Sequence, residues 1–222
     1  MDFGTARRAM VDGQVRTSDV IHFGIIAAML DIPREVFVPK AQAAFAYLDR
    51  DVAISATGTR YLIKPMVLAR LLQAADPGPA SRVLVIGAGT GYSAAVLSRL
   101  AGEVIALEED PALCAQARAA LARADAAINA GRISIVEGPL AGGSPERGPY
   151  DVVLVDGGVE TVPDTLCPQL SSQGRLLAVE VKGPVGRAKL FQPVNGRWSS
   201  RELFDAVAPV LPGFRVAPTF VF

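Results

Sequence analysis

Residues 82–93 read Arg82-Val-Leu-Val-Ile-Gly-Ala-Gly-Thr-Gly-Tyr-Ser93. Residues 83–86 form an unbroken apolar run, which is typical of a strand buried on both faces of a parallel sheet. A glycine-rich turn follows directly, and apolar residues at helical spacing begin at Ala94. Glycines let the backbone turn sharply and approach a ligand, which the free N–H groups at the helix start then face. The stretch therefore predicts the first unit of a nucleotide-binding α/β fold.

The glycine spacing narrows the choice of ligand. Gly87, Gly89 and Gly91 form the pattern G-x-G-x-G. The dinucleotide fingerprint G-x-G-x-x-G needs a small residue at the next position, which here is Tyr92. The observed spacing resembles the S-adenosylmethionine loop of class I methyltransferases, and it disfavours an NAD-dependent oxidoreductase. A glycine turn in some other α/β protein stays open as an alternative, because such turns recur across functions.

Acidic residues stand at the ends of the predicted strands, at the positions that class I methyltransferases use to hold their cofactor. Glu108 closes the apolar segment 104–107, and a carboxylate there accepts hydrogen bonds from both ribose hydroxyls. Glu137 follows segment 133–136, where the class uses an acid to accept from the adenine amino group; a solvated strand-end glutamate is the alternative. Asp156 ends the fourth apolar segment, beside the crevice where α/β sheets bind ligands. The predicted cofactor-binding residues are Gly87, Ala88, Gly89, Gly91, Glu108, Glu137, Gly138 and Asp156.

Composition excludes several classes of protein. The chain has 22 lysines and arginines and 22 aspartates and glutamates, so its formal net charge is zero. It therefore has no overall positive charge that would attract nucleic acid or an anionic membrane. Cys114 and Cys167 are expected to be reduced thiols, and a single histidine, His22, argues against a His/Cys metal cage. The N-terminus lacks a signal-peptide core, and no apolar run reaches spanning length. We expect a cytoplasmic protein that binds no metal, nucleic acid or membrane.

The remaining segments complete the predicted fold. Residues 6–15 and 21–30 show helical spacing, with Ser18 or Asp19 as the cap of the second helix. After the fourth strand we expect a helix near 166–170 and a fifth strand over 175–179. Asn195-Gly196 predicts an antiparallel hairpin between 188–194 and 197–204, and 206–214 is expected to close the sheet. The prediction is one α/β domain over 1–222: a helical cap and substrate-loop region (1–75), then a Rossmann-like class I methyltransferase core (76–222) with helices on both faces of its sheet.

The N-terminal region carries a more specific resemblance. Arg8, Met10-Val11, Gln14, the segment Ile32-Pro-Arg-Glu-Val-Phe-Val-Pro39 and Ala46-Tyr-Leu-Asp49 resemble protein-L-isoaspartate O-methyltransferases. The resemblance runs through the glycine turn and thins after about residue 180. It implies S-adenosylmethionine-dependent methylation of a carboxylate of L-isoaspartyl residues in damaged proteins or peptides. The resulting ester cyclises to a succinimide that opens partly to normal aspartate, which is protein repair.

One loop departs from that family. The family reads roughly Gly-Gln-Thr-Ile-Ser-Gln-Pro with hydroxyls facing the substrate, whereas this chain reads Thr59-Arg-Tyr-Leu-Ile-Lys-Pro65. Tyr61 stands at the family's Thr position and Ile63 at its Ser position. Thr59, Arg60 and Tyr61 are therefore the candidate catalytic residues of a divergent loop, and the alternative is a pocket rebuilt for another substrate or for none. Because the Ser would orient the acceptor, restoring it at Ile63 is expected to raise methylation.

Three further departures bear on function. Val85 stands where the family has an acid that helps hold the methionine amino group. Asp156 stands where the family has small or neutral residues, and Glu180 replaces an apolar or Pro-Val continuation of the fifth strand. A carboxylate at Asp156 suits a neighbouring sulfonium but would repel a carboxylate acceptor. The alternative function is a degenerate member that binds S-adenosylmethionine or a protein partner without this activity, or that methylates another acceptor.

Overall fold

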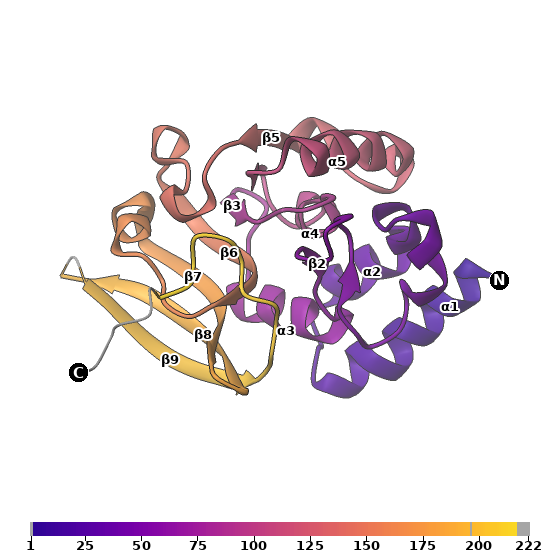
Figure 1. The fold of residues 1–222 in the computed structure, drawn as a ribbon, viewed down its shortest axis with the longest axis horizontal. Coiled ribbons are helices and arrows are strands. Elements are labelled where there is room, and N and C mark those ends of the chain that lie inside the picture. The colour runs from indigo at the N-terminus through magenta and orange to yellow at the C-terminus, as the bar shows by residue number, and fades with distance from the viewer. Residues whose placement is uncertain (1, 196, 217–222) are drawn as a thin grey trace.

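The computed structural model describes residues 2–195 and 197–216. At its centre is a seven-stranded sheet in the order β5-β4-β3-β6-β7-β8-β9 (Figure 1). The strands are β3 (Arg82–Ile86), β4 (Glu103–Glu108), β5 (Ile133–Glu137), β6 (Tyr150–Val159), β7 (Leu170–Lys182), β8 (Val185–Val194) and β9 (Arg197–Asp205). Strands β3 to β7 pair in parallel, and β8 and β9 add an antiparallel edge. The predicted Rossmann-like sheet and its C-terminal hairpin are confirmed.

Side-chain alternation along the strands gives the sheet two apolar faces. Val83 and Val85 pack into a large core with the helices, whereas Leu84 and Ile86 point into a second core on the opposite face. The α-helices are α1 (Phe3–Met10), α2 (Phe23–Asp31), α3 (Pro65–Ala75), α4 (Tyr92–Ser98) and α5 (Pro111–Arg123). The second face is covered by 3₁₀ turns at Leu140–Gly142 and Asp164–Gln169 and by the chain after β9.

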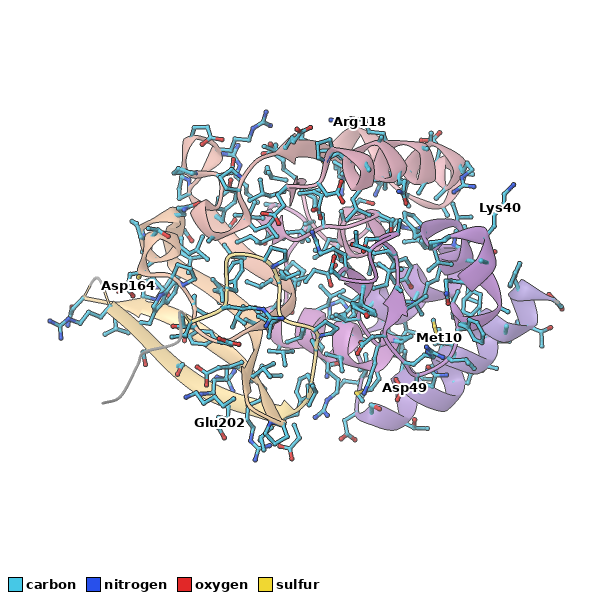
Figure 2. All side chains as sticks on the ribbon, viewed as in Figure 1. Met10, Lys40, Asp49, Arg118, Asp164 and Glu202 are labelled. Carbon is cyan, nitrogen blue, oxygen red and sulfur yellow. The ribbon has the colours of Figure 1, made fainter. Side chains whose placement is uncertain are left out.

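The N-terminal cap is helical but irregular. Helix α1 continues as a π-helical turn (Val11–Val15) and a 3₁₀ turn (Arg16–Ser18), which ends at Asp19 in the left-handed region with φ +61°. The cap of α2 is His22, whose Nδ1 accepts from the Ile25 N–H over 3.3 Å, so the prediction of Ser18 or Asp19 is wrong. Two more 3₁₀ turns follow, Arg34–Phe37 and Lys40–Phe45. Lys40 points outward from the last of these, while side chains fill the interior (Figure 2).

A small hairpin connects the cap to the sheet. Strands β1 (Val52–Ala53) and β2 (Tyr61–Leu62) pair antiparallel, and the turn between them carries the divergent loop. Its tip, residues 56–59, is exposed, whereas Ile54 and Arg60 on either side are buried. The hairpin therefore directs two side chains inward from an exposed turn.

Two predicted elements differ in the structure. The helix expected at 166–170 is a 3₁₀ turn, because Pro168 inside it lacks the N–H that an α-helix would use. The segment 206–214 does not form a strand: a single bridge joins Val210 to Gly158, and Pro209 and Pro212 remove donors that a ladder requires. Strand β6 also continues past Asp156 to Val159. Within the part of the chain that the structure describes, no helix combines the length and apolarity needed to cross a membrane.

Candidate functional site

The glycine turn between β3 and α4 has the conformation that its sequence predicts. Gly87, Gly89 and Gly91 have φ values of +77°, +56° and +93°, which side-chain-bearing residues rarely adopt. The Gly87 and Ala88 N–H groups donate to the Leu107 carbonyl over 2.9 and 3.0 Å. These bonds fix the turn to the end of β4, directly beside Glu108.

The segment 33–39 locks the cap onto this turn. The Thr90 hydroxyl donates to the Phe37 carbonyl over 2.5 Å. Arg34 is 1% exposed, lies 4.6 Å from the centroid of the Tyr92 ring, and donates to the Ala46 and Ile63 carbonyls over 2.8 and 2.7 Å. Tyr92 is therefore a packing residue, and the role of segment 33–39 is to position the turn.

Glu108 is the most heavily hydrogen-bonded group at the site. Its Oε1 accepts from Arg60 Nη1 at 2.6 Å and from the N–H groups of Glu109 and Asp110 at 3.0 and 3.1 Å. Its Oε2 accepts from Arg60 Nη2 at 2.7 Å and from the Gly89 N–H at 2.7 Å. The two ion-paired side chains are 5% and 1% exposed. The predicted ribose-binding acid thus forms a bidentate buried ion pair with an arginine of the divergent loop.

The β1–β2 turn holds Arg60 in this position. Ser55 Oγ accepts from the N–H groups of both Thr59 and Arg60 over 3.1 Å, and the Ile54 N–H donates to the Arg60 carbonyl over 2.9 Å. The turn is compact because Gly58 adopts φ +66° and Tyr61 donates its hydroxyl to the Gly58 carbonyl. The orientation of Arg60 is therefore set by the local turn as well as by its ionic partner.

Asp156 lies on the neighbouring strand at the same end of the sheet. It is 4% exposed and follows Val155, the register partner of Ile86 at the start of the glycine turn. Its Oδ2 accepts from the Ser93 hydroxyl over 2.5 Å, and its Oδ1 has no partner among the described residues. Desolvation raises the pKa of Asp156 to about 6, against the opposing effects of the Ser93 hydrogen bond and of Arg34 and Arg60.

The other predicted site residues lie around this centre. Glu137 is exposed at the end of β5, and the Gly138 N–H donates to the Glu108 carbonyl over 3.0 Å. Thr59 is exposed and Tyr61 is half-buried against its own turn, so Arg60 is the loop residue that reaches the strand ends. Ile63 is 2% exposed within the core. A side chain at this position faces the core in this arrangement, and the effect of Ser here on methylation stays a prediction.

Two apolar side chains also cover the glycine turn. A Cβ placed on Gly87 would lie 2.7 Å from Leu211 Cδ1, and one on Gly89 would lie 2.5 Å from Ile54 Cδ1. Leu211 belongs to the segment after β9 and also contacts the Cβ position of Gly157, at 2.6 Å. Sequence reasoning missed both residues. Leu211 lies in segment 206–214, which is expected from the sequence to close the sheet, and Ile54 directly precedes the divergent loop, so no local signal marks either residue as part of the site.

This sheet order, the glycine turn and the acid ending the adjacent strand define a class I methyltransferase. The family described as Protein-L-isoaspartate(D-aspartate) O-methyltransferase (PCMT) matches residues 6–197. The protein-L-isoaspartate O-methyltransferase of Methanoregula boonei is 38% identical over 81% of this chain and 78% of its own length. The protein-L-isoaspartate O-methyltransferase of Methylorubrum extorquens is 36% identical over 97% of this chain and 92% of its own length. The chain therefore belongs to the protein-L-isoaspartate O-methyltransferase family, whose methyl donor is S-adenosylmethionine.

Solved structures agree with this assignment. A protein-L-isoaspartate O-methyltransferase superimposes with a TM-score of 0.78 at 27% identity over 93% of this chain and 66% of that chain. A Plasmodium falciparum structure of the same description, in complex with S-adenosyl-L-homocysteine, superimposes with a TM-score of 0.77 at 19% identity. The superposition covers 92% of this chain and 97% of that chain. The second likeness concerns the fold alone.

The residues of the site agree with this donor in part. The left-handed glycines, the strand-end Glu108 and the Asp156 oxygen that has no partner in the described part of the chain suit a nucleoside that carries a cationic amino-acid end. The face they form is covered by Arg60, Ile54 and Leu211 of the chain itself. The framework therefore fits S-adenosylmethionine, and the covering side chains compete with it.

Proposed function

We propose that this chain transfers the methyl group of S-adenosylmethionine to the free carboxylate of L-isoaspartyl residues in damaged proteins or peptides. The observation that carries the proposal is a buried strand-end acid, Glu108, hydrogen-bonded to the glycine turn within a chain of this family. Residues 1–75 act as cap and substrate-loop region of one domain, and residues 76–222 as its donor-binding core.

The donor-binding residues follow the order of the strand ends. Glu108 would hold the ribose hydroxyls, and Glu137 with Gly138, on the next strand, would bind the adenine. The methionine end would then extend across the glycine turn toward β6. Asp156 is the carboxylate at that end, and its Oδ1, to which no residue in 2–195 or 197–216 donates, would accept from the amino group.

Asp156 can supply the carboxylate for the methionine amino group that Val85 cannot supply. Val85 pairs with Leu154 across β3 and β6, so Asp156, two residues further along β6, projects from the same face of the sheet. Both Val85 and Leu154 pack into the helical core. The negative charge is therefore supplied from the adjacent strand, closer to the crevice.

Methyl transfer requires little acid–base catalysis from the protein. When bound, S-adenosylmethionine supplies a methyl group on a sulfonium, and the acceptor carboxylate is already a nucleophile. The work of the chain is to position the two groups in line and to exclude water. Segment 33–39 contributes by holding the glycine turn rigid through Thr90 and Arg34.

Methyl incorporation tests this function. The full chain is incubated with methyl-labelled S-adenosylmethionine and either an L-isoaspartyl peptide or the same peptide with normal aspartate. The proposal expects base-labile label on the isoaspartyl peptide and background label on the other. Equal labelling of both peptides, or none on either, would contradict it.

A further inference from the structure

Glu108 has no lone pair left for a ribose in the arrangement described. A carboxylate offers about four lone-pair sites, and Glu108 accepts from two guanidinium nitrogens and three backbone N–H groups. The backbone donors belong to the turn and to the start of the next segment, so they stay in place. A ribose diol would need the two positions that the guanidinium takes.

The guanidinium also occupies space beside the glycine turn. Arg60 Nη2 lies 3.3 Å from the Cβ position of Gly87, and Ile54, from the same hairpin, contacts that of Gly89. Glycines at these positions permit close approach to a ligand, but here the approach is made by the chain itself. The β1–β2 hairpin thus covers the donor site with one charged and one apolar side chain.

The hairpin is short, and the bonds that shape its turn are internal to it. Its two strands form only the pairs Val52–Leu62 and Ala53–Tyr61, and the tip at residues 56–59 is exposed. The bonds that shape the turn, from Ser55 and Tyr61, lie within the hairpin and would move with it. Lifting the hairpin would expose the buried side chains of Ile54 and Arg60, so the lifted arrangement is a minor one.

We propose that Arg60 is a latch that determines donor affinity: its ion pair with Glu108 holds the hairpin over the glycine turn, and the donor binds after the pair breaks. The proposal rests on the proposed function for the identity of the ligand. Because the binding-competent arrangement is a minor fraction, the observed dissociation constant exceeds the intrinsic one by the reciprocal of that fraction. A buried bidentate pair makes that fraction small.

Calorimetric titration of the full chain with S-adenosylhomocysteine tests the latch. Arg60→Gln removes the charge and the bidentate geometry, and we expect it to bind about tenfold more tightly or better than the wild type. Arg60→Lys keeps the charge but makes a single-point contact, so its affinity should lie between the two. Arg50→Gln is the matched control, because Arg50 is exposed and stacks 5.2 Å over the Phe45 ring. This variant should bind like the wild type.

Each outcome decides the proposal. If the wild type binds and Arg60→Gln binds equally or more weakly, the latch is wrong while the proposed function stands. If none of the four proteins binds S-adenosylhomocysteine, both are wrong. Thermal unfolding of each variant checks folding, and if Arg60→Gln does not fold, Arg60→Lys decides: tighter binding than wild type supports the latch, and unchanged binding overturns it.

Discussion

The Ser93 hydroxyl donates to Asp156 Oδ2 over 2.5 Å, and the other oxygen of that carboxylate, Oδ1, is buried without a partner among the described residues. The bond joins the first turn of α4 to the middle of β6. It orients the carboxylate and leaves Oδ1 available to a further donor. An arrangement of this kind costs stability unless a ligand or water completes it.

Asp156 should make folding stability depend on pH. Its pKa in the folded chain, raised to about 6, lies above the ordinary value of 3.8, so the folded chain holds the proton more tightly than the unfolded chain. This stabilisation is complete below about pH 4 and is lost as pH rises through about 6. Relative to Asp156→Asn, which does not titrate, the wild type should lose on the order of 2 kcal/mol of unfolding free energy between pH 4.5 and 7.5. Denaturant unfolding at both pH values measures this difference, and a pH-independent difference would refute the assignment.

The same carboxylate should contribute to donor binding. At pH 7.5 the ionised Asp156 would bind the ammonium group of S-adenosylhomocysteine, so Asp156→Asn should weaken binding by about tenfold. Below pH 6 the wild-type carboxyl becomes protonated, and the affinities of the two proteins should converge. Calorimetric titration at pH 7.5 and 5.5 measures this. Equal affinities at pH 7.5 would place the amino group elsewhere.

Leu211 and Gly157 should be energetically coupled. A Cβ on Gly157 would lie 2.6 Å from Leu211 Cγ, so Gly157→Ala alone should cost about 1–3 kcal/mol through overpacking. Leu211→Ala alone should cost about 2–4 kcal/mol, because it leaves a cavity in the second core. Together the two should cost less than their sum by about 1 kcal/mol or more, since the smaller side chain makes room. Unfolding free energies of the four proteins form the cycle, and additive costs would mean that Leu211 does not cover this strand.

Ile63→Ser should destabilise the chain without raising its activity. The side chain lies in the main core at 2% exposure, so the change removes buried apolar surface and buries a hydroxyl, at a cost of about 3 kcal/mol. Ile21→Ser is the control, because Ile21 is 79% exposed and its loss should change stability by less than about 0.5 kcal/mol. Denaturant unfolding and the isoaspartyl methylation assay measure the two effects. Faster methylation in Ile63→Ser would show that this position reaches the acceptor.

Much of the fold follows from local pattern. The glycine spacing at 87–91 predicts the left-handed turn because few other residues tolerate those φ values. Unbroken apolar runs predict the parallel strands, and Asn195 in the left-handed region, φ +51°, agrees with the predicted hairpin. These features depend on residues that are close in the sequence.

The site depends on contacts between distant residues, which local pattern does not encode. Arg60 reaches Glu108 across 48 positions, and the sequence places the two in different segments with different predicted roles. Leu211 reaches the glycine turn because Pro209 and Pro212 divert the chain from a strand. The family resemblance predicts an acceptor-facing side chain at position 63, whereas the direction of Ile63 is set by the short strand β2 that precedes it.

Isoaspartyl methyltransferase activity is tested by following a repair reaction to its product. An L-isoaspartyl peptide is incubated with S-adenosylmethionine and either the wild type or Glu108→Gln, and the isoaspartyl and aspartyl forms are separated by chromatography over time. With the wild type, the isoaspartyl form should decline and the aspartyl form accumulate; with Glu108→Gln both changes should be much slower. An isoaspartyl peptide that stays unchanged with folded wild-type protein, under conditions where S-adenosylhomocysteine binds, would contradict it.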